Sequence, residues 1–270
     1  MKRLLLLIVS ALFIFGTLTA CGKEEESKEL SEEKIVVGVT GGPHEQIFEI
    51  VKDLAAEDGL EIELKVFSDY VMPNTALAEG EIDLNSYQHK PFMDKFNEDH
   101  ETDLAAVFPT VLSAIGVYSN EITDINDTPQ DAKIGIPNDP TNGARALILF
   151  EEAGIIELDD DKRETATPVD VVTNERNVEF IELDAAQIPL MLDEVDLAVI
   201  NGNFATANGL DPTTDSIFTE DTDSPYVNYL VSREENKDDP VIEIIKKAYF
   251  SDEVKDFIME EFKGAYQPSW

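Results

Sequence analysis

The stretch IVVGVTGGPHEQIFEIVKDL, residues 35–54, decides the fold class. It opens with a five-residue apolar run and then a glycine- and proline-containing turn at residues 41–43, which is typical of a short buried strand that ends in a turn. Beyond the turn, apolar residues from Ile47 to Leu54 recur at the spacing of one helix face. A β-rich run over residues 62–67 follows. The order of strand, helix and strand predicts a βαβ unit with two parallel strands.

The rest of the chain continues this alternation of strands and helices. Further strands are predicted at residues 104–108, 112–118, 134–136, 178–183, 197–200 and 227–231. Helices are predicted at residues 140–153, 240–250 and 252–262. The first of these helices begins with Pro140 and is followed by Gly154, the asymmetry expected at helix ends. Strands that alternate with helices favour an α/β fold whose parallel-rich sheets are covered on both faces.

Residues 1–20 have the pattern of a secretory signal peptide. The basic residues Lys2 and Arg3 precede an uncharged run over residues 4–18. That run is shorter than the roughly 20 residues of a membrane-spanning helix, and the acidic segment after it is no stop-transfer flank. We therefore expect cleavage and export rather than a transmembrane anchor.

The expected cleavage site contains the only cysteine of the chain. The sequence LTAC at residues 18–21 resembles the lipobox of bacterial lipoproteins, in which the cysteine becomes the acylated N-terminus. We predict that Cys21 is lipidated and anchors the protein to the extracytoplasmic face of the cell membrane. Residues 21–33 are rich in charge and poor in apolar residues, which predicts a flexible tether. A single cysteine excludes an internal disulfide and a zinc site built on several thiolates.

The chain is strongly acidic, with 57 Asp and Glu against 20 Lys and Arg and a formal net charge of −37. Because 43% of its residues are hydrophobic, this charge indicates a solvated acidic surface around a folded core rather than disorder. A salt-rich habitat would screen the self-repulsion. Nucleic acid is excluded as a partner, because phosphate binding requires clustered Lys and Arg.

The residues needed for catalysis are scarce. The three histidines, His44, His89 and His100, lack the HExxH spacing, and the chain has neither GxSxG nor a phosphate-binding GxxxxGK[ST] loop. The acidic run at residues 159–161 is not part of a twelve-residue calcium loop. The sequence therefore predicts no catalytic residue, no metal site and no cofactor.

Four polar clusters stand where predicted strands end. Ligands of open α/β sheets bind outside the carboxyl ends of the strands, so this recurrence points to a binding site. The clusters are FSDYVMPN at residues 67–74, NSYQHKPF at 85–92, PNDPTNGAR at 137–145 and NGNF at 201–204.

The cluster at residues 137–145 has the clearest chemistry. Pro140 is suited to begin a helix whose first N–H groups and positive dipole end attract an anion. Arg145, about one and a half turns further on, has the geometry for a two-pronged contact with a carboxylate. The alternative is that Asn138 only caps the helix and that Arg145 is a surface residue paired with one of many acids.

The other clusters supply amides and aromatic rings. Asn201 and Asn203 follow a buried strand, where their side chains could accept hydrogen bonds from an ammonium group, or could simply be turn residues. Tyr70, Tyr87 and His89 offer flat walls with polar edges, and aromatic rings make favourable contacts with a thioether sulfur. Each of these aromatic residues could equally belong to the core.

Five motifs in order along the chain resemble the MetQ/NlpA family of methionine-importer substrate-binding lipoproteins. They are DYV with PN at residues 69–74, YQHKPF at 87–92, PNDPTN at 137–142, AVIN at 198–201 and SPYVN at 224–228. The resemblance covers the mature chain and implies a type II periplasmic-binding-protein fold, in which two α/β lobes joined by two crossing segments hold the ligand in a cleft. We expect lobe 1 to comprise residues 34–117 plus 202–270, and lobe 2 residues 118–201.

The resemblance also implies roles for single residues. Arg145 would bind the carboxylate of the ligand, Asn201 its amino group, and Asn138 would support both the helix start and the carboxylate. The rings of Tyr70, Tyr87 and His89 would enclose the side chain. The full set of expected ligand-binding residues is Tyr70, Tyr87, His89, Asn138, Asn142, Arg145, Asn201, Asn203 and Tyr226.

The expected function is therefore that of a receptor and not of an enzyme. It would close on L-methionine or D-methionine and deliver it to an ABC transporter permease with its ATPase. Another amino acid or a methionine-containing dipeptide is an alternative ligand, because the polar anchors do not distinguish among them. An enzyme and a structural or adhesive surface lipoprotein are the alternatives from other classes.

Overall fold

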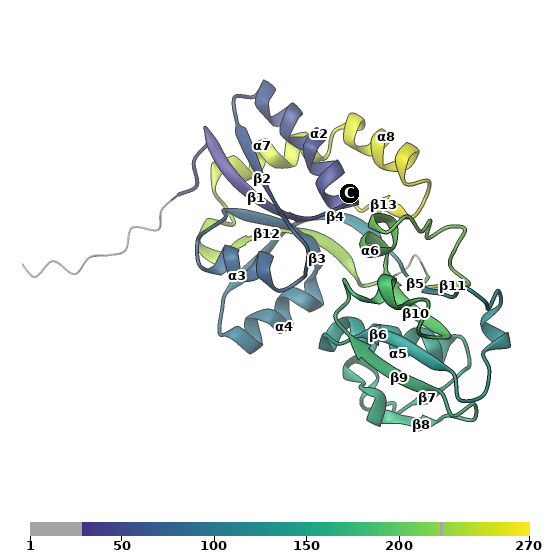
Figure 1. Ribbon diagram of the computed structural model, residues 1–270. Helices are drawn as coiled ribbons and strands as arrows, with labels where there is room; N and C mark the ends of the chain where they lie inside the picture. The colour runs from purple at the N-terminus through teal and green to yellow at the C-terminus, as the bar shows by residue number, and fades with distance from the viewer. Residues whose placement is uncertain (1–28, 222–223) are drawn as a thin grey trace, which may run out of the picture.

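The computed structural model describes residues 29–221 and 224–270, and its two large sheets are arranged side by side with helices around them (Figure 1). The first sheet has the order β13-β4-β12-β3-β1-β2. Its strands are β1 (Lys34–Thr40), β2 (Glu61–Phe67), β3 (Leu84–His89), β4 (Leu104–Ser113), β12 (Val227–Arg233) and β13 (Tyr266–Pro268).

The second sheet has the order β11-β5-β10-β6-β9. Its strands are β5 (Ile115–Tyr118), β6 (Lys133–Pro137), β9 (Glu179–Leu183), β10 (Leu197–Asn201) and β11 (Phe218–Thr219). A small hairpin-like pair, β7 (Glu157–Leu158) and β8 (Val171–Thr173), lies beyond it. The predicted alternation of strands and helices in an α/β fold is confirmed.

The opening segment forms the predicted βαβ unit. Strands β1 and β2 pair in parallel from Lys34 with Glu61 to Thr40 with Phe67, and helix α2 (Pro43–Glu57) connects them. Gly42, at the N-terminal cap of α2, has φ 91°, a left-handed conformation that suits glycine, and Pro43 begins the helix. Local sequence chemistry therefore sets both the turn and the start of the helix.

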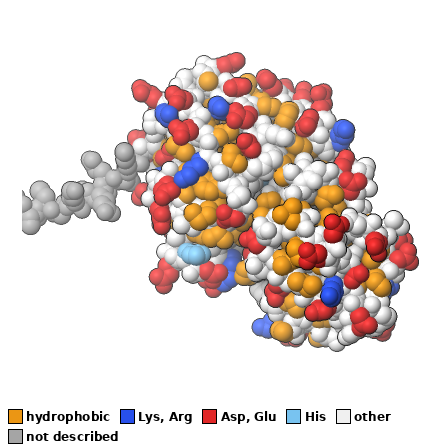
Figure 2. Space-filling model, viewed as in Figure 1, with side chains coloured by type: hydrophobic (Ala, Val, Ile, Leu, Met, Phe, Trp, Pro, Cys, Tyr) orange, Lys and Arg blue, Asp and Glu red, His pale blue; other side chains and the backbone are white. Residues whose placement is uncertain are grey.

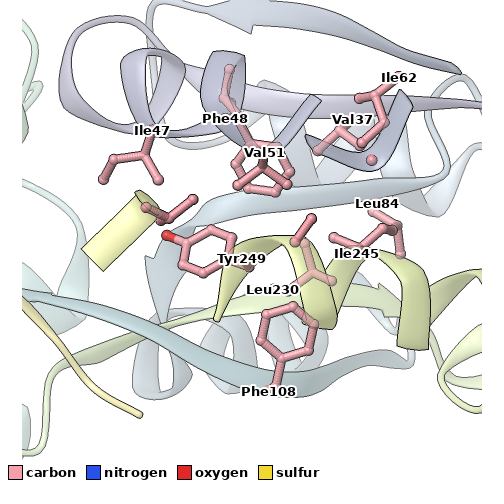
Figure 3. Packing of buried hydrophobic residues seen from close by; sticks show 14 of the residues in the cluster. Val37, Ile47, Phe48, Val51, Ile62, Leu84, Phe108, Leu230, Ile245 and Tyr249 are labelled. Carbon is pink, nitrogen blue, oxygen red and sulfur yellow. The ribbon is translucent and has the colours of Figure 1, made fainter. Parts of the chain in front are cut away.

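Helices cover both faces of the first sheet (Figure 1). Helices α2, α7 (Pro240–Tyr249) and α8 (Asp252–Glu261) pack on one face, where Ile47, Ile245 and Ile258 join the largest hydrophobic cluster. Figure 3 shows how side chains of α2 and α7, such as Phe48 and Ile245, pack against those of the strands there. Helices α3 (Met72–Ala78) and α4 (Lys90–His100) pack on the other face.

The second sheet is covered in the same way. Helix α5 (Pro140–Glu152) packs on one face through Leu147 and Phe150. The short helix α6 (Gly202–Ala207) contributes Phe204 to a cluster that includes Ile200 of β10 and a ring from the first half of the chain, Tyr70. This last cluster places residues of both halves against each other.

One predicted boundary is wrong. We expected separate strands at residues 104–108 and 112–118, but β4 runs unbroken from Leu104 to Ser113 and the chain passes to the second sheet at Ala114. Pro109 lies inside β4, where the register with β12 shifts. An irregularity of this kind accommodates a residue that cannot donate a ladder hydrogen bond. Apolar residues are continuous across both strands, so periodicity alone does not show where the chain changes sheets.

Acidic side chains are spread over the visible face of both sheets, with few basic side chains among them (Figure 2). Within residues 29–221 and 224–270, no helix combines the length and the apolar character needed to cross a bilayer. The predicted signal peptide (1–20), the lipidation of Cys21 and most of the tether (21–33) lie outside the described residues.

Candidate functional site

All four polar clusters meet at one cavity. Tyr70 comes from the segment after β2, His89 ends β3, Arg145 lies in α5 after β6, and Asn201 ends β10. The cavity is lined by His44, Tyr70, Tyr87, Gln88, His89, Phe92, Ser113, Asn142, Arg145, Asn201, Gly202, Asn203 and Asn228. The carboxyl ends of strands from both sheets thus contribute, as expected for a ligand site in this fold class.

The cavity is tight. The centre of a water-sized sphere can move through about 20 Å³ of it, which is enough for ordered water, since one water needs about 10–15 Å³ on this measure. A larger organic ligand requires the surrounding elements to move apart. Because the wall is built from two sheets, relative movement of the sheets is the simplest way to admit one.

Arg145 is buried and held by an acidic residue that sequence analysis missed. Its Nε donates to Oε1 of Glu220 at 2.9 Å, and its Nη2 donates to Oε2 of Glu220 and to the carbonyl of Ser113, the latter at 3.1 Å. The guanidinium carbon lies 4.3 Å from the ring centre of Tyr226. These contacts use Nε and Nη2, so a ligand carboxylate has Nη1 to bind or must displace Glu220. No local pattern links residues 145 and 220, which are 75 positions apart.

The start of α5 differs from the prediction by one residue. The N-terminal cap is Asp139, whose Oδ1 accepts a hydrogen bond from the backbone N–H of Asn142 at 2.9 Å. Asn138 is exposed, its backbone N–H donates to the carbonyl of Leu183, and it does not line the cavity. The expectation that Asn138 caps the helix is therefore wrong, because Asp139 is the residue that precedes the first helical position.

Two amides connect the helix cap to the cavity. Asn142 donates from Nδ2 to both carboxylate oxygens of Asp139, at 2.9 and 3.0 Å. Its Oδ1 accepts from Nδ2 of Asn201 at 2.9 Å and lies 3.2 Å from Nε2 of His89. Oδ1 of Asn201 and Nδ2 of Asn203 are buried without a hydrogen-bond partner among the described residues. An unmatched acceptor and an unmatched donor therefore face a cavity, where leaving them unpaired costs stability.

Aromatic rings form the apolar wall. Tyr70 stacks on Tyr87 with ring centres 5.8 Å apart and lies 4.8 Å from the ring of Phe204. The hydroxyl of Tyr87 donates to the carbonyl of Tyr70 at 2.6 Å, and that of Tyr70 donates to Oδ1 of Asn203. Burial raises the pKa of both tyrosines well above 10, so both remain hydrogen-bond donors at neutral pH.

The histidines of the cavity are neutral. Burial lowers the pKa of His89 to about 3, with Arg145 nearby contributing in the same direction, and burial lowers the pKa of His44 to about 4. Nε2 of His44 lies 3.4 Å from Nδ2 of Asn228, which donates to it. Neutral imidazoles leave Arg145 as the only cationic side chain among the residues that line the cavity.

The expected set of ligand-binding residues omitted several lining residues, including His44, Gln88, Ser113 and Asn228, although Gln88 lies in the cluster at 85–92 and Asn228 in the motif at 224–228. His44 lies at the start of the helix after β1 and Ser113 ends β4, so a wider window around each strand end would have found these two residues. Tyr226, which we expected at the site, packs on Arg145 and on the ring of His89, with ring centres 5.0 Å apart, but is not among the residues that line the cavity. Groups of three or more His, Cys, Asp or Glu side chains placed to hold a metal ion do not occur among the described residues.

Comparison with known proteins identifies the family. The family model for NlpA lipoprotein matches residues 35–270. The D-methionine-binding lipoprotein MetQ of Escherichia coli (strain K12) is 40% identical over 265 residues, covering 97% of this chain and 96% of the relative. Outer membrane lipoprotein 3 of Mannheimia haemolytica is also 40% identical, over 97% of this chain and 98% of its own length.

Solved structures share the fold. A nutrient binding protein from Burkholderia cenocepacia bound to methionine superposes with a TM-score of 0.86 at 41% identity and covers 87% of this chain and all of its own. The crystal structure of the methionine binding protein MetQ has a TM-score of 0.86 at 40% identity and covers 89% of this chain and 99% of its own. The expected type II periplasmic-binding-protein fold is confirmed. With a family model over nearly the whole described chain and full-length relatives at this identity, the chain belongs to the NlpA lipoprotein family.

Proposed function

We propose that this protein is the substrate-binding lipoprotein of an ABC importer and that it captures methionine, as the L or the D isomer, outside the membrane. The observation that carries the proposal is the cavity where a buried unpartnered acceptor, Asn201 Oδ1, lies with Arg145 and an aromatic wall. An α-amino acid offers an ammonium group to an acceptor and a carboxylate to a cation. The names of the relatives support methionine as the side chain.

The contacts suggest a role for each group. Asn201 Oδ1 accepts from the ligand ammonium, and Arg145 and the unpartnered Nδ2 of Asn203 donate to the carboxylate. The rings of Tyr70 and Tyr87 contact the thioether, a favourable interaction of about 0.3–1.5 kcal/mol per sulfur–aromatic contact. The protein binds and releases its ligand without chemistry, so it acts as a receptor rather than an enzyme.

Binding would close the molecule around the ligand. We propose lobes at residues 34–117 plus 202–270 and at residues 118–201, with the qualification that β5 (Ile115–Tyr118) and β11 (Phe218–Thr219) both belong to the second sheet. His89 of the first sheet and Asn142 of α5 already meet across the cleft at 3.2 Å. A ligand that contacts both lobes binds the closed state more tightly than the open state and shifts the population towards closure.

The proposed partners follow from this role. After removal of residues 1–20, the lipidated Cys21 would hold the protein at the extracytoplasmic face of the membrane. The closed, loaded protein would dock on a permease driven by an ATPase. Family membership supports a lipoprotein of an importer, and the lipobox at residues 18–21 supports the anchor.

Native mass spectrometry of freshly purified protein tests the proposal directly. We expect a co-purified mass equal to one methionine, and titration calorimetry on ligand-free protein should give the tightest binding for methionine among the amino acids. Binding of a different amino acid, or of a methionine-containing dipeptide in preference to methionine, would correct the ligand. Absence of binding to every amino acid and dipeptide tested would reject the receptor function.

A further inference from the structure

The helix cap Asp139 controls the orientation of an amide in the cavity. A carboxylate only accepts hydrogen bonds, so the two short contacts between Asp139 and the side chain of Asn142 identify the group facing the carboxylate as the Nδ2 amide. The opposite orientation would direct the amide oxygen at the carboxylate. Oδ1 of Asn142 therefore points away from Asp139, towards His89 and Asn201.

His89, on the other sheet, independently requires the same orientation of the Asn142 amide. Nδ1 of His89 accepts the backbone N–H of Phe92 at 3.2 Å, because His89 is the N-terminal cap of α4. A neutral imidazole whose Nδ1 accepts must carry its proton on Nε2. That N–H lies 3.2 Å from Oδ1 of Asn142, so it requires an acceptor there. Two helix caps from opposite sides of the cleft thus agree on how Asn142 is turned.

The orientation of the Asn142 amide in turn determines the orientation of the Asn201 amide. Because Oδ1 of Asn142 is an acceptor, the group that Asn201 presents to it at 2.9 Å is Nδ2. Oδ1 of Asn201 is then the atom left buried without a partner among the described residues, in a side chain that lines the cavity. We propose that Asp139 and His89 are positioning residues which, through Asn142, hold Asn201 Oδ1 in the cavity as the acceptor for the ligand ammonium. This inference rests on the proposed amino-acid ligand.

Replacing Asp139 by asparagine removes one of the two oxygens that hold the amide of Asn142 while retaining the helix cap. Asparagine at position 139 still accepts the backbone N–H of Asn142, since asparagine and aspartate are about equally good caps. Its Nδ2, however, takes the place of Oδ2 and faces Nδ2 of Asn142, donor against donor, so the orientation that presents Asn201 Oδ1 to the ligand ammonium is held less firmly. A purely structural role of Asp139 predicts no loss of affinity that is specific to the ammonium group.

The test compares two ligands that differ only in the ammonium group. Titration calorimetry would measure L-methionine and 4-methylthiobutanoate, which is methionine without its amino group, with the wild-type protein and with Asp139→Asn. We expect the variant to bind L-methionine about 10- to 100-fold more weakly, the range for loss of a hydrogen bond to a charged group. Its affinity for 4-methylthiobutanoate should change by less than about 3-fold, within the scatter of a substitution away from the ligand.

Asp124→Asn is a matched control. Asp124 also caps a helix and accepts both the backbone N–H and the side-chain amide of Asn126, at 2.9 Å each, but neither residue lines the cavity. This variant should bind both ligands as the wild type does. Equal weakening of both ligands by Asp139→Asn, or weakening of neither, would overturn the positioning role. Failure of the wild-type protein to bind L-methionine would reject the proposed function instead.

A second measurement is independent of any ligand. In ¹⁵N-labelled wild-type protein, long-range ¹H–¹⁵N spectra at neutral pH should show the ring of His89 with a bare Nδ1 and a protonated Nε2. The Asp139→Asn variant weakens the hold on Asn142 Oδ1, the acceptor at Nε2, so exchange of the Nε2 proton with solvent should become faster. A His89 ring protonated on Nδ1 in the wild-type protein would rule out the proposed chain even if methionine binds.

Discussion

The protein contains two groups of buried side-chain amides, and only in one of them does every polar atom have a hydrogen-bond partner. Asn74, Asn85 and Gln88 form a cluster in which every side-chain oxygen and nitrogen has a partner, with reciprocal contacts such as Asn74 Nδ2 to Gln88 Oε1 at 2.7 Å and Asn85 Nδ2 to Asn74 Oδ1 at 2.8 Å. At the cavity, Asn201 and Asn203 each keep one buried polar atom without a partner among the described residues.

This difference in hydrogen-bond pairing distinguishes a group with a structural role from a group suited to bind a ligand. In a closed network, where every polar atom is paired, the hydrogen bonds offset the desolvation of the buried amides. Here they also link α3 to β3. In an open network, a buried donor or acceptor without a partner lowers stability until a ligand provides its hydrogen-bond partner. Substitutions in the closed network should therefore lower stability and leave affinity unchanged, whereas substitutions in the open network should lower affinity and leave stability largely unchanged.

The largest effect is expected for Arg145→Ala, which breaks the buried contact to Glu220 at the edge of the open network. An uncompensated buried carboxylate should lower the free energy of unfolding by about 3–5 kcal/mol, and methionine binding should fall below detection. Urea denaturation and titration calorimetry measure the two effects. Arg163→Ala, which breaks a pair with Glu151 that is much more exposed, should cost about 0–1 kcal/mol and leave affinity unchanged. Wild-type affinity in Arg145→Ala would contradict the assignment of the carboxylate site.

Asn201→Ala should weaken binding and spare the fold. The substitution removes an acceptor that lacks an internal partner, while Asn142 Oδ1 keeps its contact with His89. We expect affinity for methionine to fall by about 10- to 100-fold, with the free energy of unfolding changed by less than about 1 kcal/mol. Calorimetric titration together with urea denaturation would show this split. A large loss of stability without a loss of affinity would mean that Asn201 belongs to the structural group.

Asn74→Ala should show the reverse behaviour. It leaves Gln88 Oε1 without its donor and Asn85 Nδ2 with only the 3.3 Å contact to the carbonyl of Pro73. Leaving buried polar groups unpaired costs about 1–3 kcal/mol of stability. Affinity for methionine should stay within about 3-fold of the wild type, because Asn74 does not line the cavity and the lining residue Gln88 keeps its contact with Asn85 at 2.9 Å. The urea midpoint and the calorimetric dissociation constant check the two parts, and a variant that binds more weakly at unchanged stability would be inconsistent with a closed network.

The smallest effect concerns pH and the buried His44. Its pKa is about 4 in the folded protein and about 6.5 in an unfolded chain. Between these values the unfolded state binds the proton and the folded state does not, so stability falls as pH drops below 6.5. At pH 5.5 the loss is about 1.4 kcal/mol relative to a residue that does not titrate. Urea denaturation of wild type and His44→Gln from pH 7.5 to 5.5 should give curves that diverge by this amount, and parallel curves would show that His44 titrates normally.

Local patterns predicted much of this molecule. The apolar run and helical spacing of residues 35–54 were sufficient for the βαβ unit, and Pro140 with Gly154 marked both ends of α5. The polar clusters that follow the strands converge at one cavity because carboxyl ends of strands gather at the same edge of a sheet. These features depend on neighbours within a few residues, or on a general rule of chain topology.

Other features depend on partners that the chain brings together from a distance. Glu220 meets Arg145 across 75 residues, and the change of sheets at Ala114 falls inside a continuous apolar segment. The helix cap is Asp139 and not the predicted Asn138. Because of this one-residue difference, the residue that orients Asn142 is a carboxylate rather than an exposed amide. Both residues are good caps, so composition alone did not choose between them.

The sequence by itself thus determined the α/β class, the acidic character, the resemblance to a family of binding lipoproteins and the segments that carry the site. Only the tertiary structure decided which of the chemically identical amides are complete and which are open. Asn74 and Asn201 both lie in polar clusters beside strand ends. Their roles differ because hydrogen-bond satisfaction depends on the exact three-dimensional partners of each atom, and those partners come from segments that no local pattern connects.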